Sequence, residues 1–124
     1  IDSTQFALSD GSGLAANNLV SPASLVQLLR FIRGHHGWET FAAGLPRSGD
    51  TGSLRTRFVG TPIEGRVRAK TGSISRTNTL SGYVDLPDGR FLTFSVMANH
   101  HVQPSRPTLA RIDSVVVEFA RQPR

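Results

Sequence analysis

The spacing of apolar residues near the N-terminus predicts an amphipathic helix over residues 22–33. Ser21 followed by Pro22 is a typical helix start, and Gly34 ends the apolar run. Four side chains recur at intervals of three and four residues, as they do on one face of a helix: Leu25, Leu28, Leu29 and Ile32. We expect this face to pack on the core.

After Gly60 the pattern changes to that of β-strands. Residues 66–73, 79–86 and 90–99 are predicted to form three strands of an antiparallel sheet. Pro87-Asp88-Gly89 has the composition of a hairpin turn between the last two strands. The third strand has apolar or small residues at successive positions, which fits a strand that is covered on both faces.

Helical spacing returns over residues 107–121, where three consecutive valines require packing against the sheet to hold the helix. A short helix is predicted over residues 38–45. Residues 53–59 fit a short helix and an irregular strand equally well. Residues 1–18 have the composition of a loop. The order helix, three-stranded sheet, helix predicts an α+β fold of two layers.

The composition is that of one small domain, or of a part of one. The chain has 124 residues, of which 38% are hydrophobic. It contains no run of roughly 18 apolar residues, so no transmembrane segment is expected, and its first residues lack the features of a signal peptide. Because the chain begins at Ile1 and not at methionine, we expect that it has been processed or trimmed.

The net charge, the absence of cysteine and the positions of the histidines argue against several classes of function. The net charge of +5 raises the hypothesis of nucleic-acid binding, but the arginines form no dense run and no aromatic platform accompanies them, so nucleic acid is not the expected partner. The chain has no cysteine, which excludes disulfides. The pairs His35-His36 and His100-His101 lack further ligands at metal-site spacing, so no metal or other cofactor is expected.

Lys70 is the strongest candidate for chemistry. Of fourteen basic residues it is the only lysine. Arginine stays charged at any ordinary pH, whereas a lysine is a compact charge whose pKa can be lowered. From composition alone, a solvent-exposed lysine without a role explains the presence of a single lysine equally well. The residues that follow favour a site, because Thr71 and Ser73 offer hydroxyls and Gly72 allows close approach to the backbone.

Lys-Thr-Gly on a strand is a signature of penicillin-binding proteins and serine β-lactamases. Together with four other segments in a fixed order, it resembles the C-terminal portion of the class C low-molecular-mass penicillin-binding proteins, the D-alanyl-D-alanine carboxypeptidase/endopeptidase family. The resemblance covers nearly the whole chain. Its segments are Asp10-Gly11-Ser12-Gly13-Leu14, Asn18-Leu19-Val20-Ser21-Pro22, Leu45-Pro46 with Gly49 and Gly52-Ser53-Leu54, Ala69-Lys70-Thr71-Gly72-Ser73, and Leu80-Ser81-Gly82-Tyr83-Val84.

The resemblance implies the penicillin-binding protein/serine β-lactamase-like transpeptidase fold, with residues 1–124 as the C-terminal part of one such domain. It implies that Lys70 is catalytic, that it bridges the serine of the Ser-x-Asn element toward the nucleophile, and that it supplies positive potential for the terminal carboxylate of the peptide. Thr71 and Ser73 would hydrogen-bond the terminal carboxylate of the substrate peptide. The backbone N–H of Ser73 would be one of two oxyanion-hole donors.

Three further residues are assigned to the substrate-binding site by the same resemblance. Gly72 belongs to the Lys-Thr-Gly element itself. Ser75 matches a hydroxyl that lies along the substrate in relatives, and Leu14 matches a residue near the pocket. The family usually has Leu-Ser-Arg-x-Asn where this chain has Leu-Ala-Ala-Asn-Asn from Leu14 to Asn18, so a contact by that arginine is absent.

The nucleophile is missing from the chain. Val67 stands where a Ser-x-x-Lys ending at Lys70 would need its serine, and the sequence contains no Ser-x-Asn. Without a nucleophile no acyl-enzyme can form. The chain alone is therefore predicted to be inactive and to be a C-terminal piece of a longer enzyme, with the first strand at a sheet edge and apolar surface that promotes association.

The predicted function is that of a fragment of a serine-type D-Ala-D-Ala carboxypeptidase or endopeptidase. Its expected partners are peptidoglycan stem peptides, β-lactams and the missing N-terminal part of the parent protein, and the expected location is periplasmic or extracellular. The alternative is a catalytically inactive module that binds peptidoglycan or a protein through the same groove. The upstream reading frame distinguishes the two, because a Ser-x-x-Lys and a Ser-x-Asn there favour the enzyme.

Overall fold

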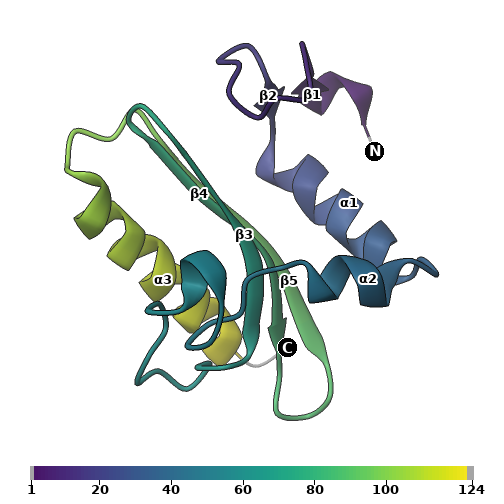
Figure 1. Cartoon of the computed structure of the whole chain (residues 1–124), viewed down its shortest axis with the longest axis vertical. Helices are drawn as coiled ribbons and strands as arrows, with labels where there is room; N and C mark the ends of the chain where they lie inside the picture. Colours follow the sequence, from purple (N-terminus) through teal and green to yellow (C-terminus); the bar gives the residue numbers. More distant parts are fainter. Residues whose placement is uncertain (1, 123–124) are drawn as a thin grey trace.

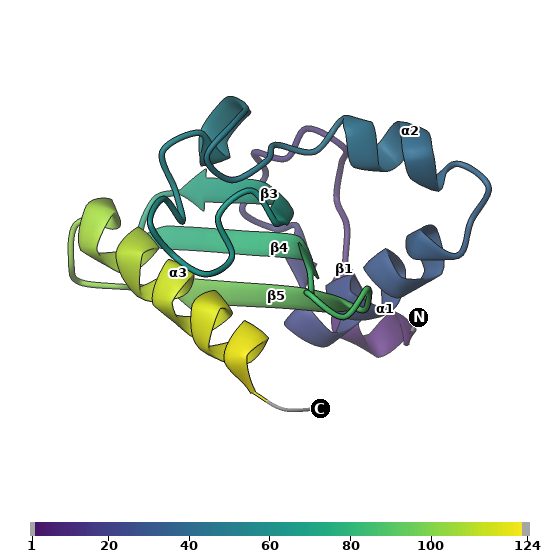
Figure 2. The same cartoon turned by 90° about the horizontal axis from the view of Figure 1, so that it is seen from below.

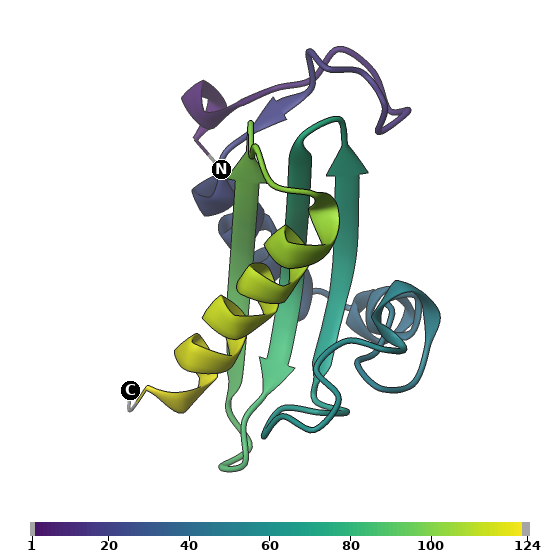
Figure 3. The same cartoon turned by 90° about the vertical axis from the view of Figure 1, so that its left-hand side faces the viewer.

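The computed structural model describes residues 2–122 and has an antiparallel sheet between helices. The sheet consists of β3 (Val67–Ile74), β4 (Thr77–Asp85) and β5 (Phe91–Asn99) in that order. Helix α3 (Ser105–Arg121) covers one face of the sheet, and α1 (Pro22–Arg33) lies on the other (Figures 1 and 3). The predicted α+β class is confirmed, although the helices add a layer on each side of the sheet.

The N-terminal part of the chain forms smaller elements. A short 3-10 helix (Ser3–Gln5) leads into β1 (Phe6–Ala7), which pairs antiparallel with β2 (Leu19–Val20). These two strands, with two residues each, were not predicted, since such short segments carry no alternation. Helix α2 (Trp38–Ala43) follows α1 and lies toward the side of the sheet where α1 lies (Figure 2).

The main core lies between α3 and the sheet. Alternate residues of the strands point to this face and meet the inner side of α3, together with apolar side chains of the segment before β3. The most deeply buried members are Leu54, Val67, Ala69, Leu80, Val84 and Val116. The predicted valine-rich helix therefore depends on the sheet, as expected from the poor intrinsic helix propensity of its β-branched residues.

The opposite face of the sheet is held to α1 by polar and aromatic contacts. Tyr83 is buried, and its hydroxyl donates a hydrogen bond of 2.7 Å to the carbonyl of Leu29. The Arg33 guanidinium lies 4.4 Å from the ring centre of Trp38 and 4.8 Å from that of Phe91, which are cation–π distances. Arg33 thus anchors the end of α1 to the sheet.

Three local predictions needed correction. The first hairpin has a two-residue turn at Ser75 and Arg76, so β3 and β4 extend beyond the predicted ends at residues 73 and 79. The turn was missed because Arg76 takes a positive φ of 54°, a conformation that usually calls for glycine. Residues 53–59 form no strand and contain the end of a single 3-10 turn (Gly52–Leu54). Leu28 is partly exposed and not part of the buried helix face.

Strands β3 and β4 approach so closely that Gly82 has no room for a side chain. A Cβ at this position would lie 2.6 Å from both the Cα and the Cβ of Ala69, and it would also strike the carbonyl oxygen of Arg68. Because backbone atoms of β3 cannot move aside cheaply, glycine at position 82 sets the spacing of the hairpin that carries Lys70.

We expect Gly82→Ala to destabilise the fold by about 1–3 kcal/mol, the usual cost of overpacking. The midpoint of thermal unfolding measures this effect. Gly11→Ala is the matched control, because a Cβ at Gly11 meets no atom within 4 Å and its φ is not positive. Equal midpoints for the two variants would contradict the close approach.

Candidate active site

The outer edge of β3 pairs with another backbone segment in the first half of the strand and not in the second half. The N–H of Ala69 donates to the carbonyl of Pro46 at 3.1 Å, and the carbonyl of Val67 accepts from the N–H of Ser48 at 3.0 Å. The backbone groups of Val67 and Ala69 therefore point away from β4. Since backbone orientation alternates along an antiparallel strand, those of Thr71 and Ser73 point to the same outer side.

Beyond Ala69, no other backbone segment within residues 2–122 pairs with this outer edge. The N–H of Ser73 is therefore directed away from the sheet, in the orientation that an oxyanion donor requires. The free edge is short, because β3 ends at Ile74. The structure thus places the predicted Thr71 and Ser73 side by side on one open edge.

Lys70 and Gly72 lie on the face of β3 that is opposite to α3. Lys70 is exposed, and its Nζ donates a hydrogen bond of 2.7 Å to the carbonyl of Thr71. A Cβ at Gly72 would strike the hydroxyl of Thr79 on the neighbouring strand, so a side chain at position 72 would require the Thr79 side chain to move. Because the carbonyl of Thr71 points to the outer edge, the hydrogen bond from Nζ brings the ammonium group of Lys70 to that edge.

Two residues that were not predicted as site residues contact the hydroxyls of the site. Thr71 Oγ1 donates to Ser53 Oγ at 3.2 Å, and Asn78 Nδ2 donates to Ser73 Oγ at 3.1 Å. Ser53 belongs to a segment of the family resemblance, but its role could not be derived from the sequence. Asn78 lies just before the predicted strand 79–86, so no sequence signal pointed to its burial or to its contact with Ser73.

The other two predicted substrate residues are less closely connected to β3. Ser75 is exposed in the turn after β3, and no hydrogen bond of its side chain occurs among the described residues. Leu14 is 76% exposed on a separate loop, and no contact with the Lys70–Ser73 segment is recorded in the described part of the chain. Their assignment to the substrate site stays a prediction.

The loop that carries Leu14 is ordered by its own polar side chains. Asn18 Oδ1 accepts from the backbone N–H of Ser9 at 2.7 Å, and Asn18 Nδ2 donates to Asp10 Oδ1 at 3.0 Å. Asp10 Oδ1 also accepts from the N–H of Ser12 at 3.1 Å. These hydrogen bonds, first that of Asn18 and then those of Ser12, hold the pKa of Asp10 below its usual value.

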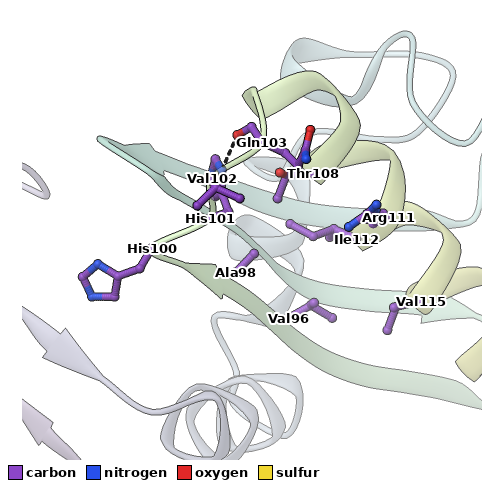
Figure 4. Close-up of a pocket in the computed structure, with 10 residues that line it drawn as sticks. All are labelled: Val96, Ala98, His100, His101, Val102, Gln103, Thr108, Arg111, Ile112 and Val115. Atoms are coloured by element: carbon purple, nitrogen blue, oxygen red, sulfur yellow. Dashed lines mark hydrogen bonds between the residues drawn. The ribbon is translucent and has the colours of Figure 1, made fainter.

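Two cavities lie away from the candidate site. One, of about 460 Å³, is lined mainly by apolar residues of β5 and α3 (Figure 4). His101 lies in it with Nδ1 bonded to the carbonyl of Gln103 at 2.7 Å (Figure 4). The second cavity lies on the other side of α3 and is lined in part by the partly buried ion pair of Arg57 and Asp113. Neither cavity is lined by a predicted site residue.

The described residues form neither a metal-ligand cluster nor a membrane-spanning helix. Residues 2–122 contain no cluster of histidine, aspartate or glutamate that could hold a metal ion. In the same range no helix is both long and apolar enough to cross a membrane.

The chain belongs to the D-Ala-D-Ala carboxypeptidase 3 (S13) family, whose model matches residues 1–122. It is 39% identical to a D-alanyl-D-alanine carboxypeptidase of Actinomadura sp. (strain R39) over 97% of this chain and 23% of that protein. It therefore spans about a quarter of the length of this curated relative. The family predicted from the five segments is confirmed.

Solved structures with the same fold agree with this family. Penicillin-binding protein 4 of Haemophilus influenzae, in complex with a β-lactam, matches with a TM-score of 0.85 and 25% identity over 94% of this chain and 29% of that one. A predatory endopeptidase of Bdellovibrio bacteriovorus acylated by penicillin G matches with a TM-score of 0.65 and 18% identity, over 96% of this chain and 33% of that one. The predicted transpeptidase-like fold is thereby confirmed.

We expect Asn18→Ala to raise the pKa of Asp10 toward its ordinary value of 3.8, because the largest stabilising hydrogen bond of the carboxylate is lost. NMR titration of the Asp10 side chain measures this change. A lowered pKa means that the carboxylate stabilises the loop above pH 3.8 and that this contribution disappears as the pH falls through the lowered value. Asn17→Ala, at an exposed neighbour, is the control and leaves the titration unchanged.

Proposed function

We propose that this chain is part of a serine-type D-Ala-D-Ala carboxypeptidase or endopeptidase that acts on peptidoglycan peptides and is acylated by β-lactams. The observation that carries the proposal is the free edge of β3, on which Lys70, Thr71 and Ser73 lie together with outward backbone groups. An extended peptide can pair with such an edge as an added strand. The chain would supply this edge and the Lys70 ammonium to the active site.

The polar groups of the free edge suit a substrate that carries a carboxylate and acylates the enzyme. The ammonium of Lys70 gives positive potential next to the strand, and the hydroxyls of Thr71 and Ser73 can donate to a carboxylate. The N–H of Ser73 is a donor for the oxygen of a carbonyl under attack. Each of these groups acts on a substrate that another part of the protein must attack, because none is a serine activated by a base.

The nucleophile and its base would come from the part of the parent protein that this chain does not contain. The sequence has no Ser-x-x-Lys and no Ser-x-Asn, while the Actinomadura relative is about four times as long as the matched region. The 124 residues alone are accordingly inactive. Peptidoglycan lies outside the cytoplasmic membrane, so we place the parent protein in the periplasm or at the cell exterior.

The absence of a nucleophile from the sequence also supports a second candidate function. If the upstream reading frame lacks a Ser-x-x-Lys, the same free edge would bind peptidoglycan peptides or a protein segment without catalysis. The two candidates differ in one chemical property, since only the enzyme forms a covalent adduct with a β-lactam.

We expect no mass change when the 124-residue chain is incubated with a penicillin, and one penicilloyl adduct on the protein encoded by the complete reading frame. Intact-mass spectrometry measures both. Lys70→Arg in the longer protein should slow acylation by at least about a hundredfold, as loss of an electrostatic group does. Arg30→Lys, an exposed exchange of the same charge on α1, is the control. A penicilloyl adduct on the isolated chain would refute the missing-nucleophile argument.

The free edge of β5 marks a second surface for the rest of the parent protein. Within residues 2–122, β5 pairs only with β4. The apolar cavity between β5 and α3 lies beside it, and Val102 and Val115 on its rim are 83% and 39% exposed. A strand from the missing part, with apolar side chains directed toward α3, would pair with β5 and cover this cavity.

We expect alternate amides of β5 to exchange quickly with deuterium in the 124-residue chain and at least about tenfold more slowly in the protein from the complete reading frame. The reason is that each outward N–H gains a backbone partner. Amides of β4 are the internal control, because this central strand is paired on both sides in the chain alone. Equal exchange of β5 in both proteins would show that the missing part docks elsewhere.

A further inference from the structure

Asn78 is a buried amide at a position where the fold otherwise has apolar side chains. It is 1% exposed and shares a face of β4 with Leu80 and Val84, which are fully buried. Its Oδ1 is buried and has no hydrogen-bond partner in the described part of the chain. A buried polar atom without a partner costs about 1–3 kcal/mol, so a hydrophobic residue of similar size would stabilise the fold better. Asn78 therefore needs an explanation other than stability.

Within residues 2–122, the one hydrogen bond of the Asn78 side chain is to the candidate site. Asn78 and Ser73 are directly opposite each other in the β3–β4 register, and Asn78 Nδ2 donates to Ser73 Oγ at 3.1 Å. An amide N–H can donate but cannot accept. It therefore occupies a lone pair of the Ser73 hydroxyl and leaves the hydroxyl proton available for another acceptor.

We propose that Asn78 is a positioning residue that keeps the Ser73 hydroxyl as a donor toward an anionic group of the ligand on the free edge of β3. The inference rests on the proposed function, because it requires a ligand whose carboxylate lies at this edge. A carboxylate only accepts hydrogen bonds, so a hydroxyl that is already supported from behind by a donor suits it. The β3–β4 pairing fixes the distance between the two side chains.

A purely structural role and a positioning role predict opposite results for Asn78→Leu. If Asn78 served the fold, its loss would lower the unfolding temperature. If it serves Ser73, Asn78→Leu keeps or raises the unfolding temperature, because a buried unpaired oxygen is removed, and it weakens ligand binding. The loss expected for one neutral hydrogen bond is about threefold to tenfold.

The test is acylation by penicillin of the protein encoded by the complete reading frame, over a range of penicillin concentrations. We expect Asn78→Leu to raise the concentration for half-maximal acylation rate about threefold to tenfold and to leave the maximal rate unchanged. In a Ser73→Ala background the same substitution has no further effect. Gln27→Leu, at an exposed amide on α1, is the control.

Each other outcome overturns the inference. Equal acylation by wild type and Asn78→Leu shows that Asn78 does not act on the site, and an equal loss in both backgrounds shows that it does not act through Ser73. If leucine prevents folding, Asn78→Val gives the same comparison with a smaller side chain. A wild-type protein that forms no adduct overturns the proposed function as well, which separates that failure from a failure of Asn78 alone.

Discussion

The candidate site depends on one change along β3, where the outer edge passes from paired to unpaired backbone between Ala69 and Thr71. Up to Ala69, the segment from Pro46 to Ser48 satisfies the outward N–H and C=O groups. From Thr71 to Ser73 the same groups face outward without a backbone partner in the described chain. Backbone polar groups require partners or water, so this short stretch is suited to an extended peptide. One strand thus provides both the anchor and the recognition edge.

The alternation of side chains along β3 divides the chemistry between two faces. Lys70 lies on the face opposite α3, whereas Thr71 and Ser73 lie on the face that α3 covers further along the strand. A ligand that meets both the ammonium and the hydroxyls must therefore lie across the edge of the sheet and not on either face. The large cavities beside α3 are on a face and an edge that Lys70 does not reach, which is why they do not coincide with the site.

The sequence predicted the main elements because their signals are periodic. The helices α1 and α3 and the β4–β5 turn at residues 87–89 needed only local patterns, and the structure confirmed them, although Leu28 of the predicted α1 stripe is partly exposed. The β3–β4 turn was missed because Arg76 adopts a conformation for which its side chain gives no signal. The contacts of Ser53 and Asn78 with the site could not be predicted either, since they join residues through tertiary packing and strand register.

The two open edges of the sheet both support the proposal that this chain is one part of a longer enzyme. The edge of β5 is long and borders an apolar cavity, so it calls for a permanent strand. The edge of β3 is short and is lined by an ammonium group and hydroxyls, so it suits a ligand that binds and dissociates. In the proposed enzyme a nucleophile would have to reach a substrate on the Lys70 side of β3. On this face of the sheet α1 packs mainly on β5 and β4. Lys70 is exposed, so in the proposed enzyme a further part of the parent protein would approach it from this side and supply the nucleophilic serine.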